Sequence, residues 1–213
     1  MNFNLTLDDI LLNLIVIAIF LGIAFPVHEF SHAAVAYMRG DATAKLQGRL
    51  TLNPIVHFDP MGGMLMIVTV FLGGFLFGWA KPTPYNPLNL RNRRNDEVLV
   101  ALAGPASNLV MAVIGAFVIR VIIAAGVQVP PVVDAVLVNF LIFNVALAIF
   151  NLIPVPPLDG SSLLYRFLSP QMAWQVRPFL SQYGMFIVLG AVLLGGRLLQ
   201  GVIYGVAGFL VGA

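Results

Sequence analysis

Four apolar segments, each long enough to cross a lipid bilayer as a helix, constrain the fold of this chain. They cover residues 11–38, 98–125, 132–153 and 179–211, and a helix needs about 20 apolar residues to span the hydrocarbon core. Hydrophobic residues make up 60% of the 213 positions and charged residues only 9%, which is typical of membrane proteins. The sequence therefore predicts an all-α polytopic membrane protein with about four to six transmembrane helices.

Composition excludes several classes of protein. The chain has no cysteine, so disulfides, thiol catalysis and cysteine-ligated zinc are excluded. Its basic residues lie in short loops between apolar segments, and we expect no nucleic-acid partner. The start of the chain lacks the basic region of a cleaved signal peptide, so the first apolar segment is expected to be retained. We therefore expect one integral-membrane domain over residues 1–213.

Two segments depart from a simple transmembrane helix. Residues 179–211 contain Gly195 and Gly196, so they predict either one long helix or two short ones. Residues 61–80 are apolar but rich in glycine, and residues 45–52 before them alternate polar and apolar side chains, a weak strand signal. Residues 39–97 are therefore expected to form a cytoplasmic and re-entrant region, partly β, between the first two core helices.

Two topologies are open for residues 61–80. An ordinary transmembrane helix would place Lys81 and the arginines that follow it outside the cell, against the positive-inside tendency. A segment that dips into the bilayer and returns leaves nine of the eleven Lys and Arg residues in the cytoplasm, and glycine-rich backbone is tolerated where it packs against protein. We adopt the re-entrant topology. The nine are Arg39, Lys45, Arg49, Lys81, Arg91, Arg93, Arg94, Arg166 and Arg177.

A polar motif, His-Glu-Phe-Ser-His at residues 28–32, lies inside the first apolar segment. On a helix, residues four positions apart share a face, so His28 and His32 can bind the same Zn²⁺. Glu29 lies beside them, where it can accept a proton from an attacking water. Imidazoles and a carboxylate without partners are costly in lipid, which favours a metal site over a polar contact between helices.

Asp159 is the expected third ligand. The segment that begins at residue 132 ends in Asn-Leu-Ile-Pro-Val-Pro-Pro-Leu-Asp-Gly, residues 151–160, where the prolines stop the helix. The re-entrant topology brings this end to the same membrane face as His28 and His32. Two imidazoles and one carboxylate can form a catalytic zinc site that leaves one coordination position open. The alternative role for this aspartate is a simple turn before Gly160. We expect one Zn²⁺ per chain.

The three motifs together resemble the site-2 protease family of intramembrane zinc metalloproteases, in a compact branch without a PDZ or CBS domain. The resemblance rests on residues 28–32, on Ala-Gly-Pro-Ala-Ser-Asn at 103–108, and on the Leu-Asp-Gly core within 151–160. It implies that His28, His32 and Asp159 bind zinc and that Glu29 is the catalytic acid and base. It also implies a re-entrant β element between the first two core helices.

By the same resemblance, the chain would hydrolyse peptide bonds of transmembrane or membrane-associated proteins. The implied setting is regulated intramembrane proteolysis in the cell membrane of a prokaryote, with the active site toward the cytoplasm. Asn151 holds the position of a residue that orients substrate or binds the oxyanion, and a helix-terminal hydrogen bond is an equal alternative. The alternative function is a non-proteolytic zinc-binding membrane protein, either a pseudoprotease or a metal transporter. A transporter would carry ionisable groups along a path, but here they converge on one place.

Three other polar residues have two interpretations each. His57 could be an auxiliary metal contact, but a structural position in its loop is favoured. Asn108 could face substrate or pack between helices. Asn144 is expected to hold neighbouring helices together. The expected partners are thus a transmembrane protein substrate and the lipid bilayer, while the oligomeric state is not predicted.

Overall fold

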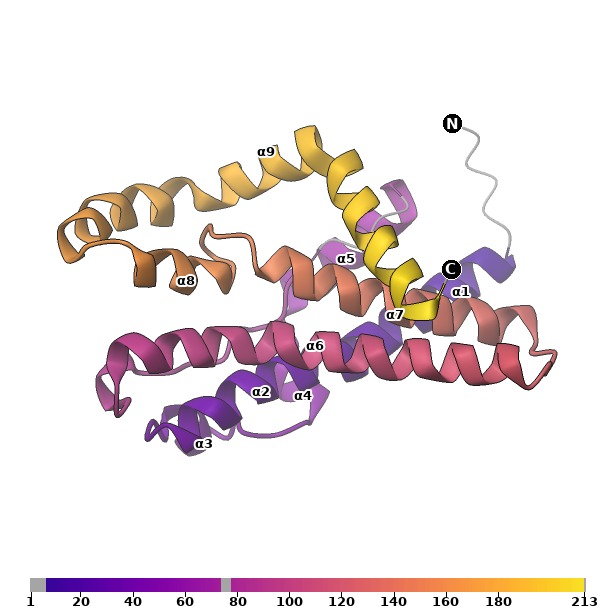
Figure 1. Ribbon diagram of the computed structural model, residues 1–213, viewed down its shortest axis with the longest axis horizontal. Coiled ribbons are helices and arrows are strands. Elements are labelled where there is room, and N and C mark those ends of the chain that lie inside the picture. Colours follow the sequence, from indigo (N-terminus) through magenta and orange to yellow (C-terminus); the bar gives the residue numbers. More distant parts are fainter. Residues whose placement is uncertain (1–6, 74–77, 213) are drawn as a thin grey trace.

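The chain folds into helices and connecting segments, and the computed structural model describes residues 7–73 and 78–212 (Figure 1). No strand occurs within those ranges, which confirms the all-α class. The elements are α1 Leu7–Ile19, η1 Phe20–Ala24, α2 Phe25–Met38, α3 Thr43–Leu46, α4 Pro54–His57, α5 Pro60–Gly73, η2 Pro87–Asn89, α6 Arg93–Ala124, α7 Pro131–Asn151, α8 Gly160–Phe167 and α9 Pro170–Val211.

Four helical stretches within the described ranges are long and apolar enough to cross a membrane: Ile10–Met38, Arg93–Ala124, Pro131–Asn151 and Pro170–Val211. Many of their large apolar side chains are exposed, because a lipid-facing surface has no water to avoid. The chain is accordingly a multi-pass integral membrane protein, and the number of long spans lies at the lower end of the predicted four to six.

The first span is one continuous rod with a local irregularity just before the His-Glu motif. A π-helical turn, η1, joins α1 to α2, and Pro26 stands in the first turn of α2. Proline has no N–H to donate to the preceding turn, which suits this break in the regular hydrogen-bond ladder. Single π-helical turns often occur beside functional sites, and here the motif of residues 28–32 follows directly.

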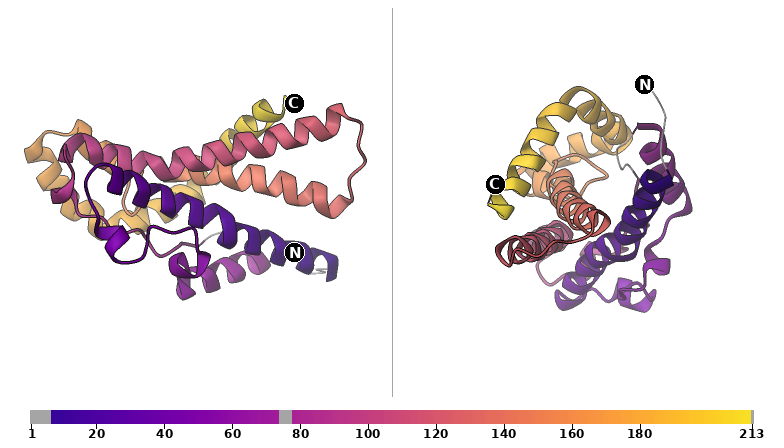
Figure 2. Two further views of the ribbon diagram at one scale, coloured as in Figure 1. Left: turned by 90° about the horizontal axis from the view of Figure 1, so that it is seen from below. Right: turned by 90° about the vertical axis from the view of Figure 1, so that its right-hand side faces the viewer.

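Helices α6 and α7 form the centre of the molecule and run side by side in opposite directions (Figures 1 and 2). Small residues on α6 allow this close approach, as is usual between membrane helices. In the first span, α2 packs along α6 while α1 and η1 contact α7, and the bent helix α9 lies against α6 and α7 from another side. The buried core of this region consists of Ala112, Ala116, Ile119, Leu141, Val145, Ile203 and Ala207.

The described residues at the two ends of the glycine-rich segment lie side by side. The N–H of Lys81, which follows the segment, donates to the carbonyl oxygen of His57, which precedes it, at 2.8 Å. Gly62 and Gly78 also lie close together. A Cβ on Gly62 would overlap the backbone of Trp79, and a Cβ on Gly78 would overlap the backbone of Gly62. This proximity agrees with a re-entrant course, and the path of the segment through the bilayer stays a prediction. Residues 74–77 of the predicted element lie outside the described residues.

The β contribution predicted for this region is wrong for the residues described. Residues 60–73 form helix α5, and the weak strand signal at 45–52 falls on helix α3 and the turns that follow it. Asp41 explains part of the difference, because its carboxylate accepts from the N–H and the hydroxyl of Thr43 and so starts a helical turn. A strand also needs a neighbour to satisfy its backbone, and none of the described segments supplies one.

Helix α9 resolves the choice left open for the end of the chain. It is one helix, capped at its start by Ser169 and ended by Gly212, whose φ of 85° is the left-handed conformation that favours glycine. It begins before the apolar segment predicted from residue 179, and it is visibly bent (Figure 1). Gly184 allows α9 to touch the backbone of Pro156, in the segment that leads to Asp159.

Candidate metal centre

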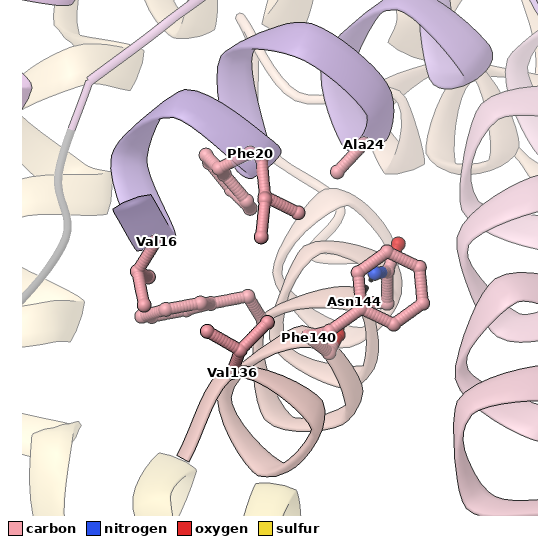
Figure 3. Close-up of a pocket in the computed structure, with 8 residues that line it drawn as sticks. Val16, Phe20, Ala24, Val136, Phe140 and Asn144 are labelled. Atoms are coloured by element: carbon pink, nitrogen blue, oxygen red, sulfur yellow. Dashed lines mark hydrogen bonds between the residues drawn. The ribbon is translucent and has the colours of Figure 1, made fainter. Parts of the chain in front are cut away.

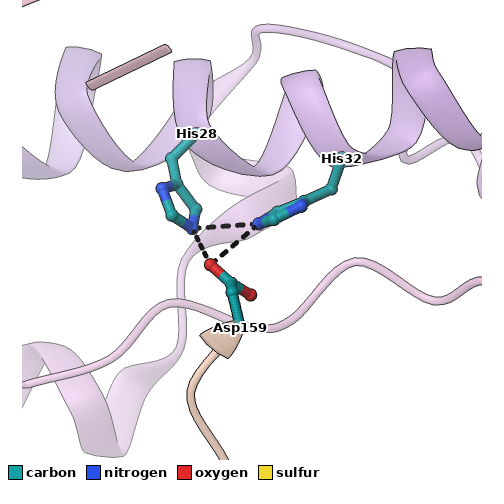
Figure 4. Close-up of side chains that lie close together, drawn as sticks. All are labelled: His28, His32 and Asp159. Atoms are coloured by element: carbon teal, nitrogen blue, oxygen red, sulfur yellow. Dashed lines mark hydrogen bonds and ion pairs between the residues drawn. The ribbon is translucent and has the colours of Figure 1, made fainter. Parts of the chain in front are cut away.

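The side chains of His28, His32 and Asp159 converge on one point (Figure 4). The two histidines lie one turn apart on α2, and Asp159 stands at the N-terminal end of α8. Asp159 Oδ2 is 3.2 Å from His28 Nε2 and 3.4 Å from His32 Nε2, and the two Nε2 atoms are 3.0 Å apart. The three residues predicted as ligands are therefore brought together although Asp159 is distant from the histidines in sequence.

The outer nitrogens of both imidazoles face hydrogen-bond acceptors. His28 Nδ1 lies 2.6 Å from Asn108 Oδ1, and His32 Nδ1 lies 2.6 Å from the carbonyl oxygen of Val100. Because each acceptor requires a donor, we assign the ring proton to Nδ1 in both histidines. Both Nε2 lone pairs then point toward Asp159.

This arrangement fits a cation. Two imidazole lone pairs and a carboxylate oxygen would repel one another at these distances if nothing positive lay between them. Asp159 Oδ2 is also buried and without a hydrogen-bond partner. Two imidazole nitrogens and one carboxylate oxygen are a donor set found in catalytic zinc sites. In such sites the other nitrogen of each imidazole usually donates to an acceptor, as Nδ1 does here.

Helix α6 passes directly behind the two imidazoles. A Cβ on Gly104 would overlap the ring nitrogen of His32 and the ring of His28, so only glycine leaves room there. Asn108, one turn later on the same helix, accepts from His28 and is fully buried. The predicted motif at residues 103–108 thus supports the metal centre from outside. The sequence left the role of Asn108 open between substrate contact and packing.

A buried amide chain continues from Asn108 to α7. Asn108 Nδ2 donates to Asn144 Oδ1 at 3.0 Å, and Asn144 Nδ2 donates to the carbonyl oxygen of Phe140 at 2.8 Å. Asn144 thereby links α6 and α7, as expected from its place in an apolar segment. It also borders a cavity of about 10 Å³ between the first span and α7, lined mainly by apolar side chains (Figure 3). This cavity holds one water at most.

Glu29 is held by the segment that follows α5. Its Oε2 accepts from the backbone N–H of Thr83 at 2.7 Å, and its backbone oxygen accepts from the Thr83 hydroxyl at 2.9 Å. Arg49 in turn fixes this segment, because its guanidinium donates to the carbonyl oxygens of Lys81 and Pro82 and also to that of Val56. Sequence reasoning did not single out Thr83 and gave Arg49 no role, because both act through backbone groups.

A cavity of about 560 Å³ opens beside the three converging side chains. Residues 78–86 pass along it without helical structure, and Trp79, Thr83 and Tyr85 contribute to its lining. Asn151 also lines it, from the C-terminal end of α7, while its Nδ2 donates to the carbonyl oxygen of Leu147 at 3.1 Å. Asn151 thus makes a helix-terminal hydrogen bond and also lines the cavity, which is compatible with both interpretations.

His57 lies outside the metal centre. Its Nε2 is 2.8 Å from the carbonyl oxygen of Thr51, and only 1% of the residue is exposed. Among the described residues, the group able to hold a metal consists of His28, His32 and Asp159. The favoured interpretation of His57, a structural residue of its loop, agrees with this position.

Comparisons with known proteins point to one family. The sequence model of Peptidase family M50 matches residues 16–130, a range that includes the motif at 28–32 and ends before Asp159. The chain is 41% identical over 186 residues to "Putative zinc metalloprotease YwhC" of Bacillus subtilis, covering 83% of this chain and 80% of that one.

Mycobacterial proteins are also similar. The chain is 32% identical over 171 residues to "Putative zinc metalloprotease Rip2" of Mycolicibacterium smegmatis, covering 76% of this chain and 61% of that one. It is 32% identical over 189 residues to the protein of the same name in Mycobacterium tuberculosis, with 86% and 68% covered. No solved structure matches the chain significantly.

Proposed function

The chain belongs to peptidase family M50, and from this premise we propose that it is a zinc metalloprotease that cleaves transmembrane or membrane-associated proteins. The observation that carries the proposal is the convergence of His28, His32 and Asp159 beside Glu29 and a cavity of about 560 Å³. The membrane spans around this centre explain why such a substrate would be a membrane protein.

His28, His32 and Asp159 would hold the metal, and their donor atoms suit zinc. Zinc supplies Lewis acidity, which activates water and polarises the scissile carbonyl. The hydrogen bonds to Asn108 and Val100 keep both imidazoles in the tautomer that presents Nε2. The zinc-binding role of these three side chains is thus supported by geometry and by the tautomer that their surroundings impose.

Glu29 would serve as the general base and then as the general acid. The Thr83 N–H occupies Oε2 and fixes the direction of the carboxylate, which leaves Oε1 for the proton of the attacking water. After attack on the scissile carbonyl, the same oxygen can deliver that proton to the leaving amine. Residues 78–86, which follow α5, therefore take part in orienting the base.

The substrate would bind in extended form. A helix engages its carbonyl groups in hydrogen bonds to residues four positions on, so the scissile region must unwind before attack. Residues 78–86 run along the cavity without helical partners, which makes their backbone a suitable template for an added strand. Asn151 would orient the substrate or bind the developing oxyanion from the opposite wall.

We place the centre toward the cytoplasmic side of a prokaryotic cell membrane. With α5 re-entrant, the basic residues of the loops around the centre and of α8 lie at the same end of the molecule. The positive-inside rule assigns that end to the cytoplasm. Water needed for hydrolysis can reach the centre from this end.

Glu29→Gln tests the function directly. The purified chain and the variant are compared for bound metal and for cleavage of transmembrane peptides in lipid. We expect one zinc per chain in both, and cleavage in the original chain only, because glutamine cannot accept the proton. A loss of at least about 100-fold is expected from removal of a general base.

Other outcomes would contradict the proposal. Equal cleavage by both proteins would exclude Glu29 as the base. Absence of stoichiometric zinc from a folded original chain would exclude the metal centre. Zinc in both proteins without cleavage of any peptide, including peptides from proteins captured by the Glu29→Gln variant, would favour a non-proteolytic zinc-binding protein.

A further inference from the structure

A second cavity lies at the end of the molecule where α6 begins and α8 ends. Its volume is about 80 Å³, several times the roughly 10–15 Å³ that one water requires. Three arginines from three helices line it: Arg94 of α6, Arg166 of α8 and Arg177 of α9. Neither the sequence motifs nor the proposed protease mechanism gives these arginines a role.

The cavity has an excess of positive charge. Glu97 also lines it, but within residues 7–73 and 78–212 none of its arginines forms an ion pair with a carboxylate. Arg94 donates to the carbonyl oxygen of Arg166 at 2.9 Å, and Arg166 Nε donates to Asn95 Oδ1 at 3.1 Å. These contacts orient the guanidinium groups without neutralising them.

Arg177 and Tyr165 are the least engaged members of the lining. The guanidinium of Arg177 lies over the ring of Tyr165, 4.5 Å from its centroid. The Tyr165 hydroxyl is buried and has no hydrogen-bond partner. A buried hydroxyl normally has a partner, so this one indicates a ligand with an acceptor oxygen.

Exposed apolar side chains lie next in sequence to residues that line the cavity. Phe167 is 84% exposed, Met172 51% and Trp174 80%, and all three lie between the end of α8 and the first turns of α9. Tryptophan is enriched where membrane meets water, and α6 and α9 both begin their apolar spans here. A ligand at this place would have a charged group in the cavity and apolar chains beside it.

We propose that this cavity binds the phosphate group of an anionic membrane phospholipid. The forks of Arg94, Arg166 and Arg177 match phosphate oxygens, and the Tyr165 hydroxyl donates to the same group. Inorganic phosphate offers the same oxygens, but it would leave the exposed Phe167 and Trp174 unexplained. The lipid therefore accounts for both the charge and the apolar surroundings.

The site would contact the helix that carries the aspartate of the metal centre. Ser162 of α8 lines both this cavity and the larger one, and α8 begins directly after Asp159. A bound headgroup would thus restrain α8, the helix that follows Asp159. Binding itself is independent of the proposed protease function and can be measured without it.

Native mass spectrometry of the full chain in detergent tests the lipid site. Phosphatidylglycerol and phosphatidylcholine with the same acyl chains are titrated separately, and phosphatidylglycerol is also titrated against inorganic phosphate. We expect phosphatidylglycerol to bind more tightly than phosphatidylcholine. Arg177→Gln should weaken its binding roughly fivefold, the factor that one basic side chain contributes near an anionic lipid surface.

Matched variants separate the site from general charge effects. Arg177→Lys should retain only part of the binding, because lysine keeps the charge but lacks the fork. Arg93→Gln should retain all of it, because Arg93 is exposed at the same end but does not line the cavity. Equal binding of both lipids, or equal weakening by Arg93→Gln and Arg177→Gln, would overturn the proposal. Displacement of phosphatidylglycerol by inorganic phosphate at the same low concentration would overturn the lipid as ligand.

Discussion

The chemistry of the metal centre depends on what each imidazole does with its second nitrogen. His28 donates from Nδ1 to Asn108, and His32 donates from Nδ1 to the Val100 carbonyl, both on α6. Such contacts fix the tautomer and the ring orientation, and their loss weakens metal binding even though the ligands themselves remain. Asn108 is the more informative of the two, because a side chain can be changed and a backbone carbonyl cannot.

Asn108→Leu should lower zinc affinity by about 10- to 100-fold, because His28 loses the acceptor that holds its tautomer. Asn108→Asp, which keeps an acceptor oxygen, should retain zinc affinity. Zinc binding is measured by competition with a chelator, and helix content by circular dichroism. Unchanged zinc affinity in a folded Asn108→Leu variant would show that Asn108 only packs.

Among the connecting elements, the loop between α2 and α3 is organised by one buried carboxylate. Asp41 is fully buried and accepts from the Thr43 N–H, the Thr43 hydroxyl, the Asn86 N–H and Asn89 Nδ2. Asp41 thereby links the start of α3 to the segment before η2. The same segment contains Thr83, which holds Glu29. Burial disfavours its charged form, but the hydrogen bonds from Thr43, Asn89 and Asn86 prevail and lower its pKa below the ordinary value.

Asp41→Asn should destabilise the protein by about 1–3 kcal/mol near pH 7, because the new amide places a donor where the Asn86 N–H needs an acceptor. A carboxyl with a lowered pKa stabilises the fold above its unfolded pKa and loses that contribution as the pH falls toward the folded value. Below about pH 4 the difference between the two proteins should therefore shrink. Thermal unfolding in detergent from pH 7 to pH 3 measures this.

Asp134→Asn serves as the control for that series, because Asp134 is exposed in the first turn of α7. It should change the unfolding temperature little at any pH. A difference between Asp41→Asn and the original chain that stays constant down to pH 3 would contradict the titration of Asp41. The hydrogen bonds of Asp41 would then act only through their geometry.

Across the whole molecule, the metal centre joins parts of the chain that are far apart in sequence. α2 supplies His28 and His32, while Asp159 follows α7 at the start of α8. A ligand that binds only the folded state raises the free energy of unfolding. The increase grows with the logarithm of the ligand concentration divided by the dissociation constant. A metal at this centre would therefore stabilise the arrangement of the first span against α8.

Removal of zinc with a chelator should lower the unfolding temperature, and zinc at about 100 times its dissociation constant should restore roughly 2.7 kcal/mol. Asp159→Ala should lose most of this zinc-dependent increase, since only the two histidines would remain as ligands. Thermal unfolding at several zinc concentrations provides the measurement. The same unfolding temperature with and without zinc in the original chain would contradict a metal that links these segments.

The sequence by itself determined the membrane class and the approximate positions of the long helices, and it supplied the proposed ligand set. These depend on local properties: apolar length sets a membrane span, and the spacing of His28 and His32 sets one helix face. The proximity of Asp159 to the two histidines was also predicted, from the topology that the charges of the loops favour.

The tertiary structure alone decided what surrounds those residues. Thr83 holds Glu29 through a backbone N–H, a group that every non-proline residue carries and that leaves no pattern in a sequence. Arg49 acts through the carbonyl oxygens of Lys81 and Pro82, which are more than 30 positions away. The contacts of Thr83 and Arg49 depend on how distant segments meet in space, and no local sequence pattern encodes such a meeting.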